Sequence, residues 1–449
     1  MSKLRFYLAL WMSKIVAIII RIIDESRGTN LPGAVALKID PIFIKHVKGL
    51  NPEKTVFITG TNGKSSTTKL LDHILKETGH KVISNLGGAN LTAGVAVPLL
   101  KNCSVTGKLS CDFMVMETDE RYISRIREQL PAKYLAITNI QKDQVQRNGE
   151  PSFIRGKIRD VIKPDMTVFF NNDEPNNLSL KAAGPERAVR YGVAAHEKSF
   201  VKERDFFAVT MPCPVCHSSL SFHRHNMENI GSFSCSKCGF SNDATPEYYT
   251  SSASFEKEEF VLNGTTFAFR CNRNEFLYSY TLATSIALEL GVPKEEVQKA
   301  LASYNKKVGQ WEDRKVGKHN VKYFRIKQEN SETLQSAIST IGSDKNPKTV
   351  IMGLDEYIDF YPEYINGCYM FDSSFKPFLD SDTKQCICTS PALGHVGALR
   401  FIYEGFDPSD VIVLPDSKET TLDKALSEKS ADNIYLIEEL PFWKKTGVN

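Results

Sequence analysis

The sequence lacks the features of nucleic-acid-binding, repetitive and low-complexity proteins. Its 449 residues include 56 basic and 53 acidic side chains, and the net charge of +3 gives no reason to expect a nucleic-acid partner. No internal repeat and no compositionally biased segment interrupts the chain. Hydrophobic residues at 41% and charged residues at 24% are ordinary for a globular protein, and the length predicts two or three domains.

Long apolar runs are also absent. The most apolar stretch, residues 8–23, is interrupted by Lys14 and Arg21. The longest uncharged run there, residues 6–13, is far shorter than the roughly 18 residues of a spanning helix. No small-residue cleavage site follows, so a secretory signal is not predicted and we expect a cytoplasmic protein. The segment is either a helix packed on the protein or an amphipathic helix at the inner face of the membrane.

Residues 56–71, VFITGTNGKSSTTKLL, predict a short strand, a glycine-rich turn and the start of a helix. Gly60 and Gly63 let the backbone approach a ligand closely, and the free N–H groups of a helix start bind anions. Ile58 stands where the strict phosphate-loop pattern has glycine. The order of strand, turn, Gly-Lys-Ser and helix nevertheless predicts a nucleotide-binding loop.

Two side chains of this loop and one carboxylate have the chemistry of a site for ATP and Mg²⁺. Lys64 would contact phosphate oxygens, and the hydroxyl of Ser65 would reach the metal. Glu117 follows an apolar strand, where acidic Mg²⁺ ligands often occur, although a solvated carboxylate is the alternative. The candidate nucleotide-binding residues are Gly60, Thr61, Asn62, Gly63, Lys64, Ser65 and Ser66.

Apolar runs alternate with helical segments along the chain, which predicts an α/β fold with a central parallel sheet and ligands at the carboxyl ends of its strands. We expect three ranges: an N-terminal helix and connector at 1–35, an ATP-binding domain at 36–315, and a C-terminal α/β domain at 316–449. The predicted strands are 56–58, 81–84, 112–116, 134–137, 166–170, 348–352, 367–371, 385–388 and 410–414.

A zinc ribbon is predicted as an insertion at about 205–250. Two C-x-x-C pairs are separated by 18 residues, a spacing typical of closed, structural zinc sites with four cysteine ligands, and a reducing compartment favours metal ligation over disulfides. Redox pairs and unliganded thiols are the alternatives. The predicted zinc ligands are Cys213, Cys216, Cys235 and Cys238.

Several motifs together resemble the MurT family, the Mur ligase-like subunits of lipid II isoglutaminyl synthase. TGTNGKSST resembles the nucleotide loop of Mur ligases in general. GTNLPG at 28–33, NLGGANLTAG at 85–94, METDE followed by ITNIQKDQVQRNGE at 116–150, and a four-cysteine ribbon within the ATP-binding domain follow the MurT pattern more specifically. The resemblance implies a Mur ligase-like central domain with a MurT-type C-terminal domain.

The resemblance also implies an activity. MurT proteins use ATP to amidate the α-carboxylate of D-glutamate in the lipid II stem peptide, through an acyl phosphate, and a GatD glutaminase partner supplies the ammonia. Lys64 and Glu117 would then be catalytic. Asp355, in LDEYIDF, occupies the position of an aspartate that MurT lends to the glutaminase, although the residues alone also fit a solvated turn carboxylate or a helix cap.

The sequence departs from the MurT pattern near the nucleotide. Ser279 replaces an asparagine, and Gln310 replaces an arginine that could contact phosphate. Two alternatives therefore stay open beside the MurT activity. One is a divergent Mur-like ligase acting on another carboxylate, and the other is a non-catalytic ATP-binding scaffold for a glutaminase.

Overall fold

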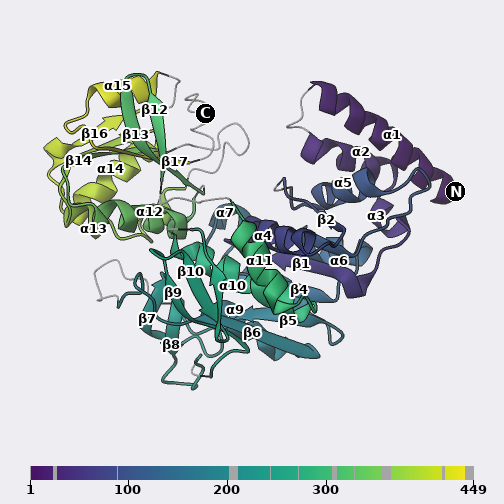
Figure 1. Cartoon of the computed structure of the whole chain (residues 1–449). Helices are drawn as coiled ribbons and strands as arrows, with labels where there is room; N and C mark the ends of the chain where they lie inside the picture. Colours follow the sequence, from purple (N-terminus) through teal and green to yellow (C-terminus); the bar gives the residue numbers. More distant parts are fainter. Residues whose placement is uncertain are drawn as a thin grey trace. The chain divides into compact units, whose positions relative to one another are not determined.

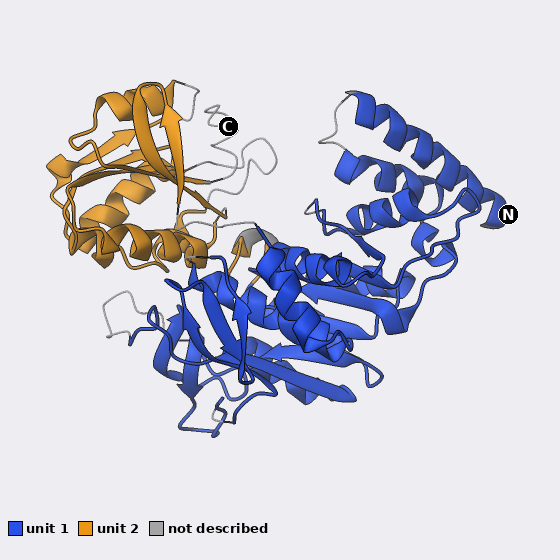
Figure 2. Ribbon diagram, in the orientation of Figure 1, with its two compact units in different colours: residues 1–141, 150–201, 211–307 blue, residues 142–149, 202–210, 308–449 orange. Residues whose placement is uncertain are grey.

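The chain builds two mainly parallel β-sheets, one in each of two units (Figures 1 and 2). This computed structural model describes residues 2–23, 28–87, 89–201, 211–242, 244–271, 273–305, 311–327, 329–354, 366–416 and 420–439. The first unit comprises residues 1–141, 150–201 and 211–307. The second comprises residues 142–149, 202–210 and 308–449.

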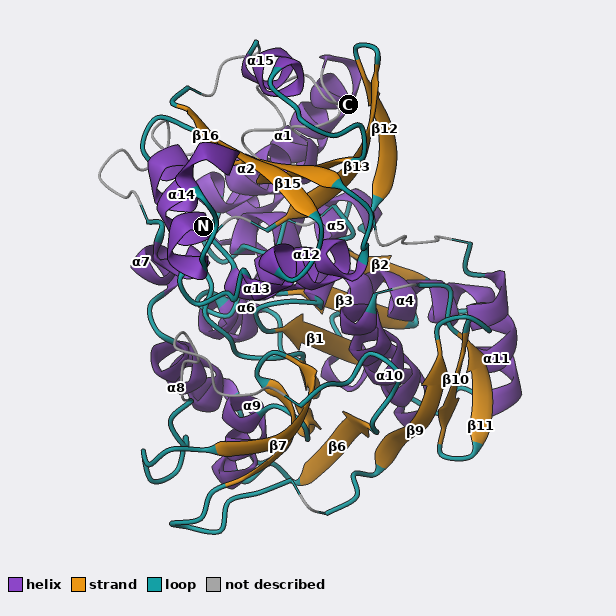
Figure 3. Cartoon of the chain, turned by 90° about the vertical axis from the view of Figure 1, so that its left-hand side faces the viewer, coloured by secondary structure: helices purple, strands orange, loops and turns teal. Residues whose placement is uncertain are grey.

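The sheet of the first unit has nine strands in the order β11-β10-β9-β6-β5-β4-β1-β3-β2. Its strands from β2 to β9 pair in parallel, and β9, β10 and β11 form an antiparallel extension beyond β6 (Figure 3). The strands are β1 Thr55–Thr59, β2 Val82–Ser84, β3 Phe113–Glu117, β4 Tyr134–Ile137, β5 Thr167–Asn171, β6 Arg187–Val193, β9 Tyr248–Ser254, β10 Glu259–Leu262 and β11 Thr265–Ala268.

Helices on this sheet bury its central strands completely. Every residue of β1 and β5 is buried, as expected for strands covered on both faces, and apolar side chains of α4 and α10 belong to the buried interior. The helices are α1 Ser2–Ile23, α2 Leu31–Ile39, α3 Phe43–His46, α4 Lys64–Glu77, α5 Thr92–Asn102, α6 Ile123–Gln129, α8 Pro151–Val161, α9 Pro175–Ser179, α10 Asn274–Glu289 and α11 Lys294–Ser303.

A two-stranded antiparallel hairpin, β7 Ser221–Met227 and β8 Ile230–Ser234, forms the ribbon that the cysteine spacing predicts. Its small core contains Leu220, Phe233 and Leu178 of α9, together with cysteine side chains. The hairpin therefore packs on the end of the main sheet and is not an isolated loop.

The second unit has a six-stranded sheet in the order β12-β13-β17-β14-β15-β16, in which only β12 is antiparallel to its neighbour. Its strands are β12 Glu312–Val316, β13 His319–Ile326, β14 Lys348–Gly353, β15 Thr383–Thr389, β16 Val411–Leu414 and β17 Ile434–Glu439. Its helices are α7 Val145–Asn148, α12 Ser331–Ser343, α13 Lys376–Leu379, α14 Leu393–Glu404 and α15 Thr421–Ser427.

The predicted strand at 367–371 is wrong. Residues Cys368–Met370 form one turn of 3-10 helix, and Tyr369 and Met370 are buried in the core of the second unit. A short apolar run bounded by turn residues fits a strand and a buried helical turn equally well, so the pattern alone could not distinguish them.

The N-terminal segment forms a single helix, α1, whose inner face packs on α2 and α5 (Figure 1). Phe6 stacks on Phe43, with ring centroids 5.4 Å apart, and Lys14 Nζ donates to Cys103 O at 2.8 Å. No helix among the residues that the structure describes is long and apolar enough to cross a membrane.

Candidate functional site

The predicted nucleotide loop follows β1 and opens α4. Gly60 has a φ of 122° and Gly63 a φ of 85°, values that other residues rarely adopt. A Cβ on Gly60 would lie 2.4 Å from Thr138 Oγ1, so the loop also requires glycine for its close approach to the end of β4. The local sequence thus favours a tight turn that leaves the N–H groups at the start of α4 available to an anion.

Asn139, just after β4, holds the loop in shape. Its backbone oxygen accepts from Thr61 N at 2.8 Å, and its side-chain amide bonds to both Asn62 N and Asn62 O, at 2.9 and 3.0 Å. Gln141 N donates to Thr61 Oγ1 at 3.0 Å. Thr61 and Asn62, predicted to bind nucleotide, are therefore fixed by a strand end that the sequence-based prediction did not assign to the site.

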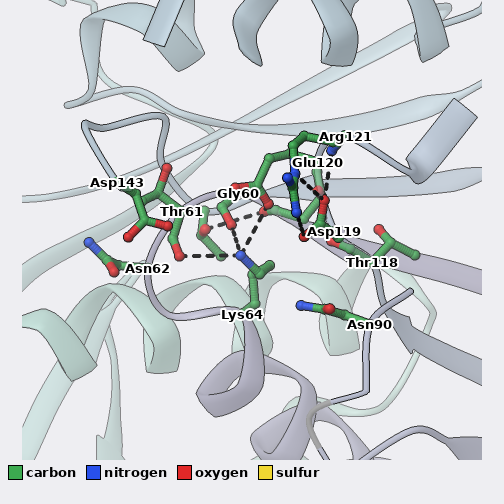
Figure 4. Close-up of polar contacts among 12 residues, drawn as sticks. Gly60, Thr61, Asn62, Lys64, Asn90, Thr118, Asp119, Glu120, Arg121 and Asp143 are labelled. Carbon is green, nitrogen blue, oxygen red and sulfur yellow. Dashed lines mark hydrogen bonds and ion pairs between the residues drawn. The ribbon is translucent and has the colours of Figure 1, made fainter. Parts of the chain in front are cut away.

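Lys64 is buried at the first position of α4, and its ammonium group points back over the loop (Figure 4). It donates to the backbone oxygens of Gly60 and Thr61, and it forms an ion pair with Glu120 Oε2 at 3.2 Å. The sequence-based prediction missed Glu120. Its only signal was the third acidic residue of the METDE motif.

Ser65 and Glu117, the two predicted Mg²⁺ ligands, lie in contact with each other. Ser65 Oγ donates to Glu117 Oε2 at 2.7 Å, and Glu117 Oε1 accepts from Asn90 Nδ2 at 3.3 Å. The side chain of Asn85 bonds to both the N–H and the carbonyl of Glu117, each at 2.8 Å, and so fixes the strand end that carries the carboxylate. A hydroxyl beside a buried carboxylate is an oxygen ligand set that fits Mg²⁺.

The remaining predicted residues lie in different places. Ser66 is half-buried in the first turn of α4. Ser279, on α10, lies beside the loop, since a Cβ built on Gly63 would come within 3.2 Å of its Oγ. Asp355 and Gln310 lie outside the described residues; β14 and the buried Leu354 lead up to Asp355.

The four predicted zinc ligands form one cluster. Their Sγ atoms all lie within 4.8 Å of one another, with 3.7 Å between Cys213 and Cys238 and 3.6 Å between Cys216 and Cys235. Two thiolates on a tetrahedral ion with Zn–S bonds of about 2.3 Å lie about 3.8 Å apart, so the spacing fits a bound metal ion. The cysteines are free thiols in the structure.

Asp173, after β5, joins the ribbon to the main sheet. Its carboxylate accepts from Val193 N at 2.7 Å, Tyr278 Oη at 2.8 Å and Asn242 Nδ2 at 3.3 Å. Its backbone oxygen accepts from Gly231 N at 2.8 Å, within the hairpin. Burial raises the pKa of Asp173 to about 6, despite these donors. The ribbon is thus anchored by a buried polar network.

Family comparisons match both halves of the chain. The Mur ligase middle domain matches residues 58–234, which include the nucleotide loop and Glu117, and the MurT ligase C-terminal domain matches residues 328–439. The chain thus combines a Mur ligase-like middle domain with a MurT-like C-terminal domain, the combination that the resemblance implies. The predicted enzyme class, an ATP-dependent ligase, is confirmed at this level.

Several relatives and solved structures are similar to this MurT-like chain. The lipid II isoglutaminyl synthase subunit MurT of Streptococcus pneumoniae is 28% identical over 92% of this chain and 90% of its own. The Staphylococcus aureus subunit is also 28% identical, over 62% of each chain. A pseudomurein peptide ligase type C from Methanothermus fervidus is similar in structure, with a TM-score of 0.65 at 20% identity, over 90% of this chain and 79% of that one.

The structural similarity confirms the predicted fold of the MurT-like chain. A MurF ligase from Thermotoga maritima, solved with ADP, also aligns, with a TM-score of 0.56 at 12% identity over 92% of this chain and 81% of that one. At such identities the likeness concerns the fold alone, a Mur ligase-like α/β architecture with a C-terminal domain. The residues of the site are therefore argued from their own contacts.

Proposed function

We propose that this chain is the ATP-dependent ligase subunit that amidates the D-glutamate α-carboxylate of the lipid II stem peptide to D-isoglutamine. The observation that carries the proposal is the buried nucleotide loop with Ser65 and Glu117 in contact at 2.7 Å, in a chain that pairs a Mur ligase middle domain with a MurT C-terminal domain. The relatives named as lipid II isoglutaminyl synthase subunits support the substrate.

Each loop residue has a role in this proposal. The N–H groups at the start of α4 and the Lys64 ammonium hold the phosphates of ATP and offset charge on the transferred phosphoryl group. Ser65 and Glu117 would hold Mg²⁺, which neutralises phosphate charge when bound. A carboxylate oxygen of the substrate attacks the γ-phosphorus and ADP leaves. Ammonia then attacks the acyl phosphate, phosphate departs with the bonding electrons, and the nitrogen loses a proton.

The ammonia comes, in this proposal, from a GatD-like glutaminase that binds the chain as a heterodimer. Asp355 would orient a histidine of that partner and stabilise the imidazolium formed when the catalytic cysteine is deprotonated. The subunit name of the relatives and the MurT C-terminal domain, which includes position 355, support a partner. Amidation of a lipid-linked precursor also places the reaction at the inner face of the membrane.

We propose Zn²⁺ as the ion of the cysteine cluster, with a structural role. Four thiolates fill all four positions of a tetrahedral site and leave none for substrate, which suits stabilisation of the ribbon and not catalysis. The contacts of the ribbon core with Leu178 of α9 and the hydrogen bonds of Asp173 connect the cysteine site to the end of the main sheet.

A divergent ligase acting on another carboxylate is the second candidate, favoured by one observation. Ser279 lies beside the nucleotide loop, at a position where the resemblance to MurT implies asparagine, and a shorter side chain there would suit a different ligand contact. A non-catalytic scaffold is disfavoured because the side chains that would hold phosphate and Mg²⁺ are all present, Lys64 in the loop and Ser65 in contact with Glu117.

The test is amidation in the reconstituted complex with glutamine, ATP and Mg²⁺, using Lys64→Ala, Glu117→Ala and the matched control Lys69→Ala. We expect the first two to lower product formation by about two to three orders of magnitude, because Lys64→Ala removes a positive charge at the phosphoryl group and Glu117→Ala removes a ligand of the Mg²⁺ that would neutralise phosphate charge. Lys69, half-buried on the same helix, should be dispensable. Unchanged ATP consumption by Lys64→Ala would refute the site, and ATP turnover without isoglutamine would favour the second candidate.

A further inference from the structure

Helix α1 is apolar on two opposite faces. Phe6, Ala9, Leu10, Ser13 and Ile20 are buried against the first unit. The outer face carries a row of exposed apolar side chains at helical spacing: Leu4, Leu8, Trp11, Ile15, Ile18 and Ile22. An ordinary surface helix has a polar outer face, so the second apolar row is not explained by packing within the chain.

The exposed row forms a continuous patch. Met12 and Ile19 widen it, so that eight of the 19 exposed large apolar side chains among the described residues lie on this helix. At 100° per residue these eight positions cover an arc of about 120°. Scattered exposed apolar residues are normal, but a patch of this length marks an interaction surface.

Basic side chains border the patch on both sides. Arg5 lies along one edge, whereas Lys3, Lys14 and Arg21 lie along the other, and the helix has no acidic residue. Lysine and arginine stems can lie along an apolar surface while their charged ends reach a polar layer beyond it. An apolar strip with positive edges complements the surface of a bilayer that contains anionic lipids.

The contacts of α1 with the rest of the first unit determine how its outer face could meet a membrane. Trp11 Nε1 donates to Val105 O at 3.0 Å, and Arg5 Nε donates to Ile39 O at 2.6 Å, so hydrogen bonds to the rest of the first unit hold the N-terminal half of the helix. A helix held in this way can lie flat on a membrane with its outer face in the interfacial layer. The exposed Val105, next to Trp11, extends the same surface.

We propose that the outer face of α1 docks flat on an anionic lipid bilayer, with Leu4, Leu8, Trp11, Ile15, Ile18 and Ile22 entering the interface and the exposed Lys3 and Arg21 contacting lipid phosphates. The inference deepens the proposed location at the membrane face, but it requires no ligase activity. Its consequence is that the first unit would be held against the surface in which a lipid-linked substrate is embedded.

Vesicle flotation of the full-length protein, without ATP or glutamine, tests the proposal. We expect binding to phosphatidylcholine vesicles containing about 30% phosphatidylglycerol, weaker binding to phosphatidylcholine alone, and a decrease with salt. Ile15→Glu with Ile18→Glu should weaken binding at least about tenfold, because two large apolar side chains no longer enter the interface. Lys3→Gln with Arg21→Gln should reduce the dependence on salt.

The matched control is Phe153→Glu with Leu399→Glu, which makes the same charge change at exposed apolar positions outside α1. It should bind vesicles like the wild type, and thermal unfolding should show that both double variants are folded. Absence of wild-type binding, or equal binding of the α1 variant, would overturn the proposal. If light scattering instead showed that the α1 variant loses self-association or the glutaminase, without any vesicle binding, the face would be a protein interface.

Discussion

At the scale of single residues, Glu174 combines a structural role with an unusual environment. It caps α9, accepting from Asn176 N at 3.0 Å and Asn177 N at 2.9 Å, and it also accepts from Ile140 N at 3.0 Å, which ties the ends of β4 and β5 together. Burial raises the pKa of Glu174 to about 7, against the effect of these donors. The carboxyl group thus titrates near neutral pH in the folded protein.

The first prediction concerns the pH dependence of stability. Because the folded-state pKa of Glu174 lies above its unfolded value of 4.5, the folded protein holds an extra proton between them. The protonated Glu174 carboxyl therefore adds about 3 kcal/mol to the free energy of unfolding, at ~1.4 kcal/mol per pKa unit. This contribution is fully present below about pH 4.5 and is lost as the pH rises through 7. In Glu174→Gln, denaturant unfolding at pH 5 to 8 should show a smaller loss of stability with rising pH.

The control for this measurement is Asp160→Asn, an exposed carboxylate on α8. It should leave the pH dependence as it is in the wild type. Asp173, whose pKa is also raised by burial, is present in all three proteins. A difference in pH dependence between the wild type and Glu174→Gln is therefore due to Glu174. An identical pH slope in wild type and Glu174→Gln would show that the buried carboxyl does not titrate in this range.

At the scale of elements, the ribbon depends on its four cysteines more than on its small hydrophobic core. We expect one Zn²⁺ per purified chain, and we expect Cys213→Ser to lose the metal and destabilise the ribbon, because structural zinc contributes directly to folding. Elemental analysis and thiol titration measure both effects. Cys368→Ser, at an exposed cysteine outside the cluster, is the matched control and should retain zinc. Zinc-free wild type with four freely reacting thiols would contradict the assignment.

The elements that could be predicted from sequence are those with a local signal. β1, β3, β4 and β5 lie within one or two residues of their predicted positions, because buried parallel strands are short apolar runs between turn residues. The antiparallel extension β9 to β11 was missed, since β9 and β11 are rich in serine and threonine and only β10 contains a short apolar run.

Non-local pairing was equally hard to predict. β17 is the last strand of the described chain, yet it lies between β13 and β14 in the centre of the second sheet. The candidate site also contains both residues that local motifs predict and contacts between distant positions that they do not. Motif spacing predicted the nucleotide loop and the four cysteines, whereas the contact of Lys64 with Glu120 joins positions 56 residues apart and became visible only in the structure.

At the scale of the whole molecule, the prediction at Asp355 concerns the complex with a glutaminase. Asp355→Asn should leave the complex assembled and able to bind ATP, but glutamine hydrolysis should fall by about two or more orders of magnitude, because an amide does not stabilise an imidazolium. Added ammonium should restore product by bypassing the glutaminase. The measurement is the rate of glutamate release by the reconstituted complex, followed by the product yield with ammonium.

Asp410→Asn, at an exposed carboxylate beside β16, serves as the control and should hydrolyse glutamine normally. Normal hydrolysis by Asp355→Asn would reduce that residue to a turn carboxylate or a helix cap, where asparagine serves as well as aspartate. Lost product that ammonium does not restore would instead assign Asp355 to the ligase reaction.

The segment 142–149 belongs to the second unit, although the residues before and after it belong to the first. Asp143 of this segment pairs with Lys327 Nζ at 2.6 Å and accepts from Asn330 Nδ2 at 3.1 Å, and Lys142 Nζ lies 3.3 Å from Asp372. A C-terminal fragment expressed from residue 308 would therefore lack a buried carboxylate of its own fold. For the same reason, a protease that cut the backbone once after Asn305 would leave two pieces held together until denaturant separated them.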